Sequence, residues 1–274
     1  MQKIELSRQT EQRQTFVKSW NGETEMKICP CIDTIYKGYE TDAALLHLKE
    51  MGFRGFECWD YHDWGIDRLI EMKERLNLQI ANIGPDFVSL SDKSMRTQFV
   101  REMEKALEAG KALEAGCVTV LSGDDTGEER KHQHESIVAG LKEAAPMAED
   151  AGVVIVLEAS NRRVNRPNNY LTSSDETFEI IDEVGSPFVK MLYDIYHQQI
   201  SEGDLLSRIL PNIDKIGHFH AAGVPHRHEL FLSEINYDFL FREIQKTDYE
   251  GWIGLEYQPT VPLEEGMAGL KKYL

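Results

Sequence analysis

One pattern constrains the fold of this chain more than any other: from about residue 27 onward, short apolar runs alternate with amphipathic segments. The runs are rich in β-branched, aromatic or cysteine residues and have the length of strands. They span 27–32, 55–60, 79–84, 117–123, 153–160, 189–196, 216–223 and 252–258. Strict alternation of nearly continuous apolar strands with helices is typical of a parallel sheet that is covered on both faces.

The segments between these runs have helical periodicity, and several end in glycine, the residue that favours the left-handed conformation just past a helix. They include 41–52, 68–77, 135–152, 174–185, 236–251 and the terminal 263–274. Eight strand–helix units without a linker or a change of composition predict an α/β fold, a single (β/α)8 TIM barrel over 26–274. Residues 1–25 are polar and aperiodic, so we interpret them as an N-terminal extension.

One helical segment contains an exact tandem hexapeptide, KALEAGKALEAG, over Lys105–Gly116. Six residues advance a helix by about 600°, which leaves the two copies about 120° out of phase. A regular helix would then place Leu107 and Leu113 on different faces. We therefore predict a bend near Gly110 and a helix end at Gly116.

The net charge argues against several classes of partner, and the cysteine spacing indicates the state of the thiols. The chain has 30 basic and 47 acidic residues, and its net charge of −17 repels the phosphates of nucleic acids and anionic membrane surfaces. The four cysteines show no CxxC spacing, which favours reduced thiols. No segment has the pattern of a signal peptide or of a membrane span. We expect a soluble, cytoplasmic protein with neither nucleic-acid nor membrane partners.

Four strand-like runs in the second half end in an acidic or imidazole side chain: Glu158, Asp194, His220 and Glu256. The carboxyl ends of the strands form the active site of such a barrel, so these residues are candidates for catalysis. Three carboxylates that converge with one imidazole repel one another unless a cation lies between them. His218 is a rival ligand, because it lies on the same pleat side as His220. Each residue alone has a purely structural explanation, but their recurrence on four consecutive strands predicts a metal site.

The types of ligand indicate the ion and the chemistry. Three carboxylates and one imidazole form a mostly hard set that suits Mn²⁺ or Mg²⁺, with Co²⁺ or Zn²⁺ as alternatives. An octahedral ion held by four protein ligands has two open positions, which fit adjacent oxygens of a hydroxy-oxo compound. Carboxylates on both sides of that compound could move a proton between neighbouring carbons through an enediol. The sequence therefore predicts a metal-dependent isomerase.

Two further side chains follow these strand ends. His197 comes three positions after Asp194, and we expect it to face the open side of the ion and bind a substrate oxygen. The alternative is a loop histidine in solvent. Arg227 lies in a turn-prone loop, and its guanidinium suits a substrate carboxylate or an electron-rich oxygen. It could equally pair with Glu229 at the surface.

The motifs MLYDIYHQQISEGDL, IDKIGHFHAAGVPHRHEL and YEGWIGLEYQP together resemble the hydroxypyruvate isomerase family, within the xylose-isomerase-like TIM barrels. The resemblance covers Val153–Pro259, and the first half is similar only in layout. It implies a divalent ion held by the four strand-end residues, with Glu158 and Glu256 as the acid/base pair. It also implies a sugar or sugar-acid substrate bound by His197 and Arg227, and a homodimer or homotetramer.

The strand ends of the first half, CPCIDTIY, FECWDYHDW and ANIGPDF, do not resemble that family closely. From position alone, we expect Glu57, Trp59 and Asn82 to line the substrate pocket. The leading prediction is an aldose–ketose type isomerase of hydroxypyruvate or a related oxo sugar acid.

Three alternatives remain. The first is a ketose 3-epimerase or short-chain sugar isomerase that acts on a neutral, unphosphorylated sugar. The second is a non-catalytic or decarboxylating relative that keeps the ion but uses it differently. The third, a metal-dependent apurinic endonuclease, needs further His and Asp ligands and a basic groove, which the charge of −17 argues against.

Overall fold

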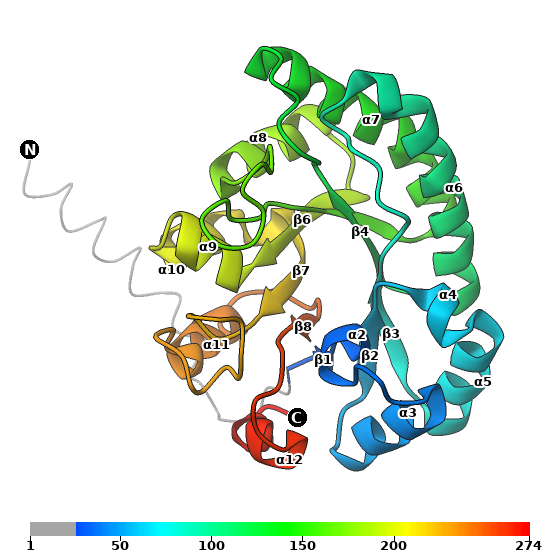
Figure 1. Cartoon of the computed structure of the whole chain (residues 1–274), viewed down its shortest axis with the longest axis vertical. Coiled ribbons are helices and arrows are strands. Elements are labelled where there is room, and N and C mark those ends of the chain that lie inside the picture. Colours follow the sequence, from blue (N-terminus) through cyan, green and yellow to red (C-terminus); the bar gives the residue numbers. More distant parts are fainter. Residues whose placement is uncertain (1–25) are drawn as a thin grey trace, which may run out of the picture.

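Eight parallel strands form the barrel that the alternating pattern predicts (Figure 1). The computed structural model describes residues 26–274, and the predicted extension over 1–25 lies outside the described residues. The strands are β1 (Ile28–Pro30), β2 (Gly55–Cys58), β3 (Gln79–Ile83), β4 (Cys117–Leu121), β5 (Val154–Glu158), β6 (Val189–Asp194), β7 (Ile216–Ala221) and β8 (Ile253–Leu255). Their order in the sheet is β1-β8-β7-β6-β5-β4-β3-β2. A parallel bridge between Cys31 and Glu57 brings the two edge strands together, so that the barrel is nearly closed.

Helices surround the barrel and connect successive strands (Figure 1). The longer ones are α3 (Thr41–Glu50), α5 (Ile66–Leu76), α6 (Arg96–Leu113), α7 (Arg130–Ala151), α8 (Ser174–Val184) and α11 (Tyr237–Gln245). Shorter ones are α2 (Ile32–Ile35), α4 (Tyr61–Trp64), α9 (Ile195–Ser201), α10 (Leu205–Ile209) and α12 (Leu263–Gly266). The helix predicted over 263–274 is wrong in length, because α12 has 4 residues and only a 3₁₀ turn, Ala268–Leu270, follows it. Within residues 26–274, no helix has both the length and the apolar character needed to cross a membrane.

The prediction for the tandem hexapeptide is wrong. α6 continues through Gly110 and ends at Leu113, and Glu114 rather than Gly116 adopts the left-handed conformation after it, with φ 54°. Leu107 and Leu113 are both buried. The apolar stripe of a surface helix is at least about 100° wide, so two leucines about 120° apart fit at its two edges.

The interior of the barrel contains polar side chains as well as apolar ones. Glu57 on β2 contacts His218 and His220 on β7, although β1 and β8 separate these two strands in the sheet. These contacts must therefore cross the inside of the barrel. The predicted reduced thiols agree with the structure, in which all four cysteines are buried and free.

Candidate active site

The ends of four consecutive strands bring the predicted metal ligands together. Glu158 ends β5, Asp194 ends β6, His220 lies in β7 and Glu256 follows β8. The strand register places Asp194 beside His220, and His220 beside Gly254, two residues before Glu256. All four side chains are buried.

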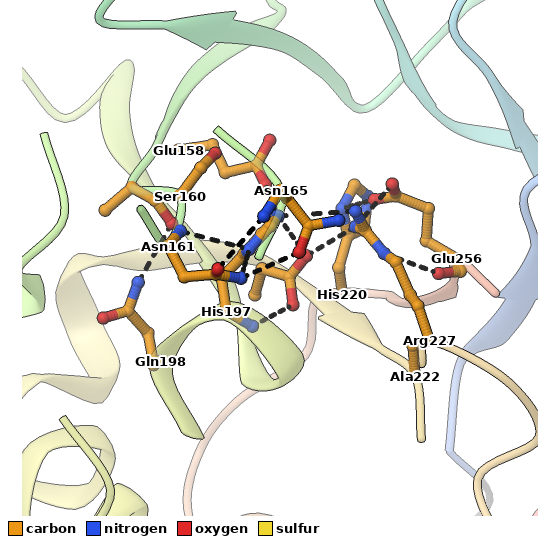
Figure 2. A network of polar contacts seen from close by, with 12 residues as sticks. Glu158, Ser160, Asn161, Asn165, His197, Gln198, His220, Ala222, Arg227 and Glu256 are labelled. Atoms are coloured by element: carbon orange, nitrogen blue, oxygen red, sulfur yellow. Dashed lines mark hydrogen bonds and ion pairs between the residues drawn. The ribbon is translucent and has the colours of Figure 1, made fainter. Parts of the chain in front are cut away.

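Residues 26–274 contain three groups of candidate ligand atoms, namely Glu57 with His218 and His220, and two groups that overlap at Asp194. Asp194, His220 and Glu256 each offer an atom within 4.8 Å of the others, and Glu158, Asp194 and His197 do the same. Because these two groups share Asp194, the four predicted ligands and His197 form one cluster, which we call the charged cluster (Figure 2).

His220 is the side chain of the cluster whose polar atoms are least satisfied. Its Nδ1 contacts Oε2 of Glu256, and its Nε2 lies 3.2 Å from Oε1 of Glu57. Both contacts are close, but neither ring nitrogen has an aligned hydrogen-bond partner among residues 26–274. Burial lowers the pKa of His220, but the carboxylates of Glu57 and Glu256 raise it more, so that the net pKa lies well above its usual value.

The carboxylates of the cluster differ in their environment. Burial and the charges of Glu256 and Asp194 raise the pKa of Glu158 to about 8. Burial also raises the pKa of Asp194, but His197 and Arg227 lower it more, so that its net pKa is below the usual value. Without an added cation, Glu158 therefore retains a proton more readily than Asp194 does.

Arg227 lies against three members of the charged cluster: Asp194, Glu256 and His197, whose Nε2 is 3.4 Å from Nη1 of Arg227. Its Nη2 is 2.8 Å from Oδ2 of Asp194 and 2.5 Å from Oε1 of Glu256. Its Nε donates to the backbone carbonyl of Glu256 at 3.1 Å, and the guanidinium lies 5.2 Å from the ring centroid of Tyr196. Arg227 therefore compensates the charge of two buried carboxylates.

The predicted alternative, a surface pair between Arg227 and Glu229, is wrong. Glu229 is buried and accepts hydrogen bonds from the backbone N and Oγ1 of Thr260, at 2.6 and 2.7 Å. The backbone N of Gln258 donates to the carbonyl of Arg227 at 2.9 Å. These bonds fasten the loop that carries Arg227 to the segment after β8.

His197 is buried, so the alternative of a loop histidine in solvent is wrong. Its Nδ1 accepts from the backbone N of Asn161 at 3.2 Å and lies 2.6 Å from Nδ2 of the same residue. Burial lowers the pKa of His197 to about 4, so the ring is neutral near pH 7. Since Nδ1 accepts, the proton lies on Nε2, which is 3.5 Å from Oε1 of Glu158. The sequence analysis missed Asn161, whose only signal is its place in the loop after β5.

The structure places Glu57 and Asn82 below the pocket rather than in its lining. Both are fully buried. Glu57 faces His218 and His220, and Nδ2 of Asn82 donates to Oγ1 of Thr119 at 2.7 Å. Thr119 does line the pocket, so Asn82 touches a lining residue from behind.

A pocket of about 240 Å³ lies beside the charged cluster, with Glu158, His197, His220 and Glu256 in its lining. Trp59 lines it as expected. Most of the remaining lining is apolar and comes from the first half of the chain. The single lysine or arginine among the described lining residues is Arg166, which the sequence analysis did not single out.

Comparison with known proteins identifies the family to which the chain belongs. Residues 45–273 match the family described as xylose isomerase-like TIM barrel. Hydroxypyruvate isomerase of Escherichia coli is 30% identical over 88% of this chain and 97% of the relative. The 2-oxo-tetronate isomerase of Cupriavidus necator is 32% identical over 74% of this chain and 83% of the relative. A solved structure described as AP endonuclease, family 2, from Brucella melitensis has a TM-score of 0.86 at 25% identity and covers 91% of this chain and 99% of its own. The predicted resemblance is confirmed, and the chain belongs to the xylose isomerase-like TIM barrel family.

Proposed function

We propose that the protein is a divalent-metal-dependent isomerase of small hydroxy-oxo acids, such as hydroxypyruvate or a 2-oxo sugar acid. The observation that carries the proposal is the convergence of Glu158, Asp194, His220 and Glu256 in one buried cluster beside a pocket. The two relatives described above are named isomerases of such acids, which supports the substrate class.

The residues present fit a divalent ion. Asp194, His220 and Glu256 would hold it together with Glu158, and the ring nitrogens of His220 are buried without an aligned partner. Three carboxylates and one imidazole suit Mn²⁺ or Mg²⁺ before Co²⁺ or Zn²⁺. When bound, the ion supplies Lewis acidity that orients and polarises the adjacent oxygens of the substrate.

The two glutamates are the proposed acid/base pair. Glu158 ends β5 and Glu256 follows β8, two strands that are not neighbours in the sheet, so each approaches the pocket from a different direction. One carboxylate removes the proton from the hydroxyl-bearing carbon, and the released electron pair forms the C=C bond of an enediol while the π pair of the carbonyl group moves to its oxygen. The other glutamate, in its protonated form, gives its proton to the former carbonyl carbon as the original hydroxyl group loses its proton and becomes the new carbonyl group. In this proposal His197, which carries its proton on Nε2, relays the proton from the original hydroxyl oxygen to the former carbonyl oxygen.

The binding of a substrate carboxylate is assigned here to Arg166. Arg227 was expected to have this role, but its guanidinium contacts Asp194 and Glu256, and it is not among the residues that line the pocket. We propose that Arg227 positions these two carboxylates. Arg166 lines the pocket and is exposed, and a guanidinium suits the recognition of a carboxylate.

The proposal is tested by stripping the protein with EDTA and reloading it with Mn²⁺, Mg²⁺, Co²⁺ or Zn²⁺ separately. Each form is assayed on hydroxypyruvate, 2-oxo-tetronate, neutral ketoses and abasic DNA. We expect no activity after stripping and isomerisation of the acids after reloading.

A pair of variants tests whether a loss of activity is specific to the charged cluster. Glu158→Gln should lower kcat by about 10²–10⁴, the range for loss of a general acid/base group. Glu135→Gln changes an exposed glutamate of α7 and should leave kcat unchanged. Full activity of the stripped protein, turnover of ketoses but not acids, or cleavage of abasic DNA alone would each overturn the proposal.

A further inference from the structure

The pocket beside the charged cluster has two chemically different sides. Its second side consists of Trp59, Phe87, Val88, Phe99, Met103 and Leu121, which we call the apolar wall. Trp59 follows β2, Phe87 and Val88 follow β3, and Leu121 ends β4. The charged cluster lies at the carboxyl ends of β5 to β8, on the other side of the barrel (Figure 1). A ligand that fills the pocket therefore touches both sides.

The apolar wall has a buried base and an exposed rim. Phe99 and Met103 of α6 are buried and form the base. At the rim, Phe87 is 59% exposed and Trp59 is 40% exposed. Large aromatic side chains are usually withdrawn from water, and an exposed aromatic rim that continues into a pocket is typical of a surface that a ligand covers.

Two of the three polar side chains on this side of the pocket, Thr119 and Glu102, are engaged with protein partners, and the third, Asp86, is an exposed carboxylate next to Phe87. The hydroxyl of Thr119 donates to Oδ1 of Asn82 at 3.0 Å and accepts from its Nδ2 at 2.7 Å. Glu102 forms an ion pair with Lys105 at 2.9 Å. A polyhydroxylated chain placed along the wall would lose hydrogen bonds to water and find few replacements, whereas an apolar group would lose none.

We propose that the substrate is amphiphilic: a hydroxy-oxo acid unit lies at the charged cluster, and an aryl substituent on the same molecule packs against the apolar wall. This rests on the proposed function, which places the hydroxy-oxo unit. The three aromatic rings of the wall offer edge and face contacts to an aryl group. A three-carbon acid would leave the wall uncovered, and a longer sugar acid would bury hydroxyl groups against it.

The experiment compares three acids on the metal-loaded protein: 2-oxo-tetronate, its 4-O-benzyl ether, and a 2-oxo-hexonate of greater length but without an apolar group. We expect kcat/KM to be at least tenfold higher for the benzyl ether than for either of the other acids, mainly through a lower KM. Equal values, or a preference for the hexonate, would overturn the inference while the proposed function stands.

Two variants locate the effect. In Phe87→Ser, the preference for the benzyl ether over 2-oxo-tetronate should fall to less than twofold, because the rim of the wall is removed. Phe239→Ser changes an exposed phenylalanine of α11, outside the pocket lining, and should keep the preference. If Phe87→Ser keeps the preference as well, the aryl group does not lie on this wall and the inference is wrong.

A binding measurement distinguishes failure of the inference from failure of the proposed function. Titration calorimetry at several temperatures should give a more negative heat-capacity change for the benzyl ether than for 2-oxo-tetronate, because apolar surface is buried. If no acid is turned over, the proposed function fails, and the heat-capacity difference still decides whether an aryl group is bound at the wall. An equal heat-capacity change for both ligands would overturn the inference whatever the turnover.

Discussion

Oε2 of Glu57 lies 2.7 Å from Nε2 of His218 at the centre of the barrel, where both side chains are fully buried. The other oxygen of the same carboxylate lies 3.2 Å from Nε2 of His220. Burial raises the pKa of Glu57, but His220 and His218 lower it more, to about 2. The carboxylate is therefore ionised, and it holds the inner nitrogen of His220 while Nδ1 faces the charged cluster.

Replacement of Glu57 should weaken ion binding. Outer partners of a ligating histidine typically contribute 10–100-fold to metal affinity, and we expect a loss of this size in Glu57→Gln. Competition with a chromophoric chelator measures the affinity, and thermal unfolding of the stripped protein shows whether the fold is kept. Glu202→Gln is the control, because Glu202 accepts from Ser174 outside the cluster. Unchanged affinity in Glu57→Gln, or an equal loss in the control, would contradict this role.

Removal of Arg227 should destabilise the metal-free protein strongly and the metal-loaded protein much less. Loss of one partner of a buried ion pair costs about 3–5 kcal/mol, and Arg227→Ala leaves Asp194 and Glu256 without their cation. A divalent ion places a positive charge beside the same carboxylates, so saturating Mn²⁺ should restore most of the lost free energy of unfolding. Urea unfolding with and without the ion measures both values. Arg242→Ala, on the surface of α11, is the control, and its loss of stability should be the same with and without the ion. An equal loss of stability with and without the ion in Arg227→Ala would refute the argument.

Loss of Arg166 should raise KM for acids and spare neutral substrates. A hydrogen bond between charged groups contributes about 1.5–3 kcal/mol, which corresponds to roughly a 10–150-fold higher KM for hydroxypyruvate in Arg166→Ala. Arg163→Ala, in the same loop but outside the pocket lining, is the matched control. Steady-state kinetics on hydroxypyruvate and on a neutral ketose of similar size gives the comparison. The assignment fails if both variants bind the acid equally well.

Gly254 should tolerate no side chain. A Cβ atom at this position would lie 2.4 Å from both oxygens of Glu57, which His218 and His220 hold in place. Overpacking of this kind costs about 1–3 kcal/mol, and we expect Gly254→Ala to lose that amount in urea unfolding. Gly110→Ala, whose Cβ would meet Val153 at 3.3 Å inside α6, should lose less. Equal stability of Gly254→Ala and the wild type would show that the carboxylate can move.

The sequence predicted the cluster but not every neighbour, for a physical reason. Glu158 and Asp194 end their strands, and the position of a strand end along a parallel barrel fixes where its side chain lies. Glu57 precedes the end of β2 by one residue, so it lies deeper than Trp59, which follows the strand and reaches the pocket. Two residues along a strand keep a side chain on the same face and move it by about 6.6 Å.

Residues that reach the site from loops carry no periodic signal. Asn161 and Arg166 belong to the segment after β5, which has neither helical nor strand periodicity, so only the folded loop brings them to His197 and the pocket. The prediction for α6 failed for a different reason. The phase difference between Leu107 and Leu113 was correct, but the buried stripe of the helix is wide enough to include both leucines. The width of that stripe depends on the neighbouring helices, which the sequence of α6 does not show.

The two sides of the pocket come from opposite halves of the polypeptide, and this separation has an evolutionary consequence. Mutations in the segments after β2, β3 and β4 alter the apolar wall without touching the strands that supply Glu158, Asp194, His220 and Glu256. A descendant gene can therefore acquire new substrates by drift in its 5′ half, while its 3′ half still encodes the proposed acid/base pair.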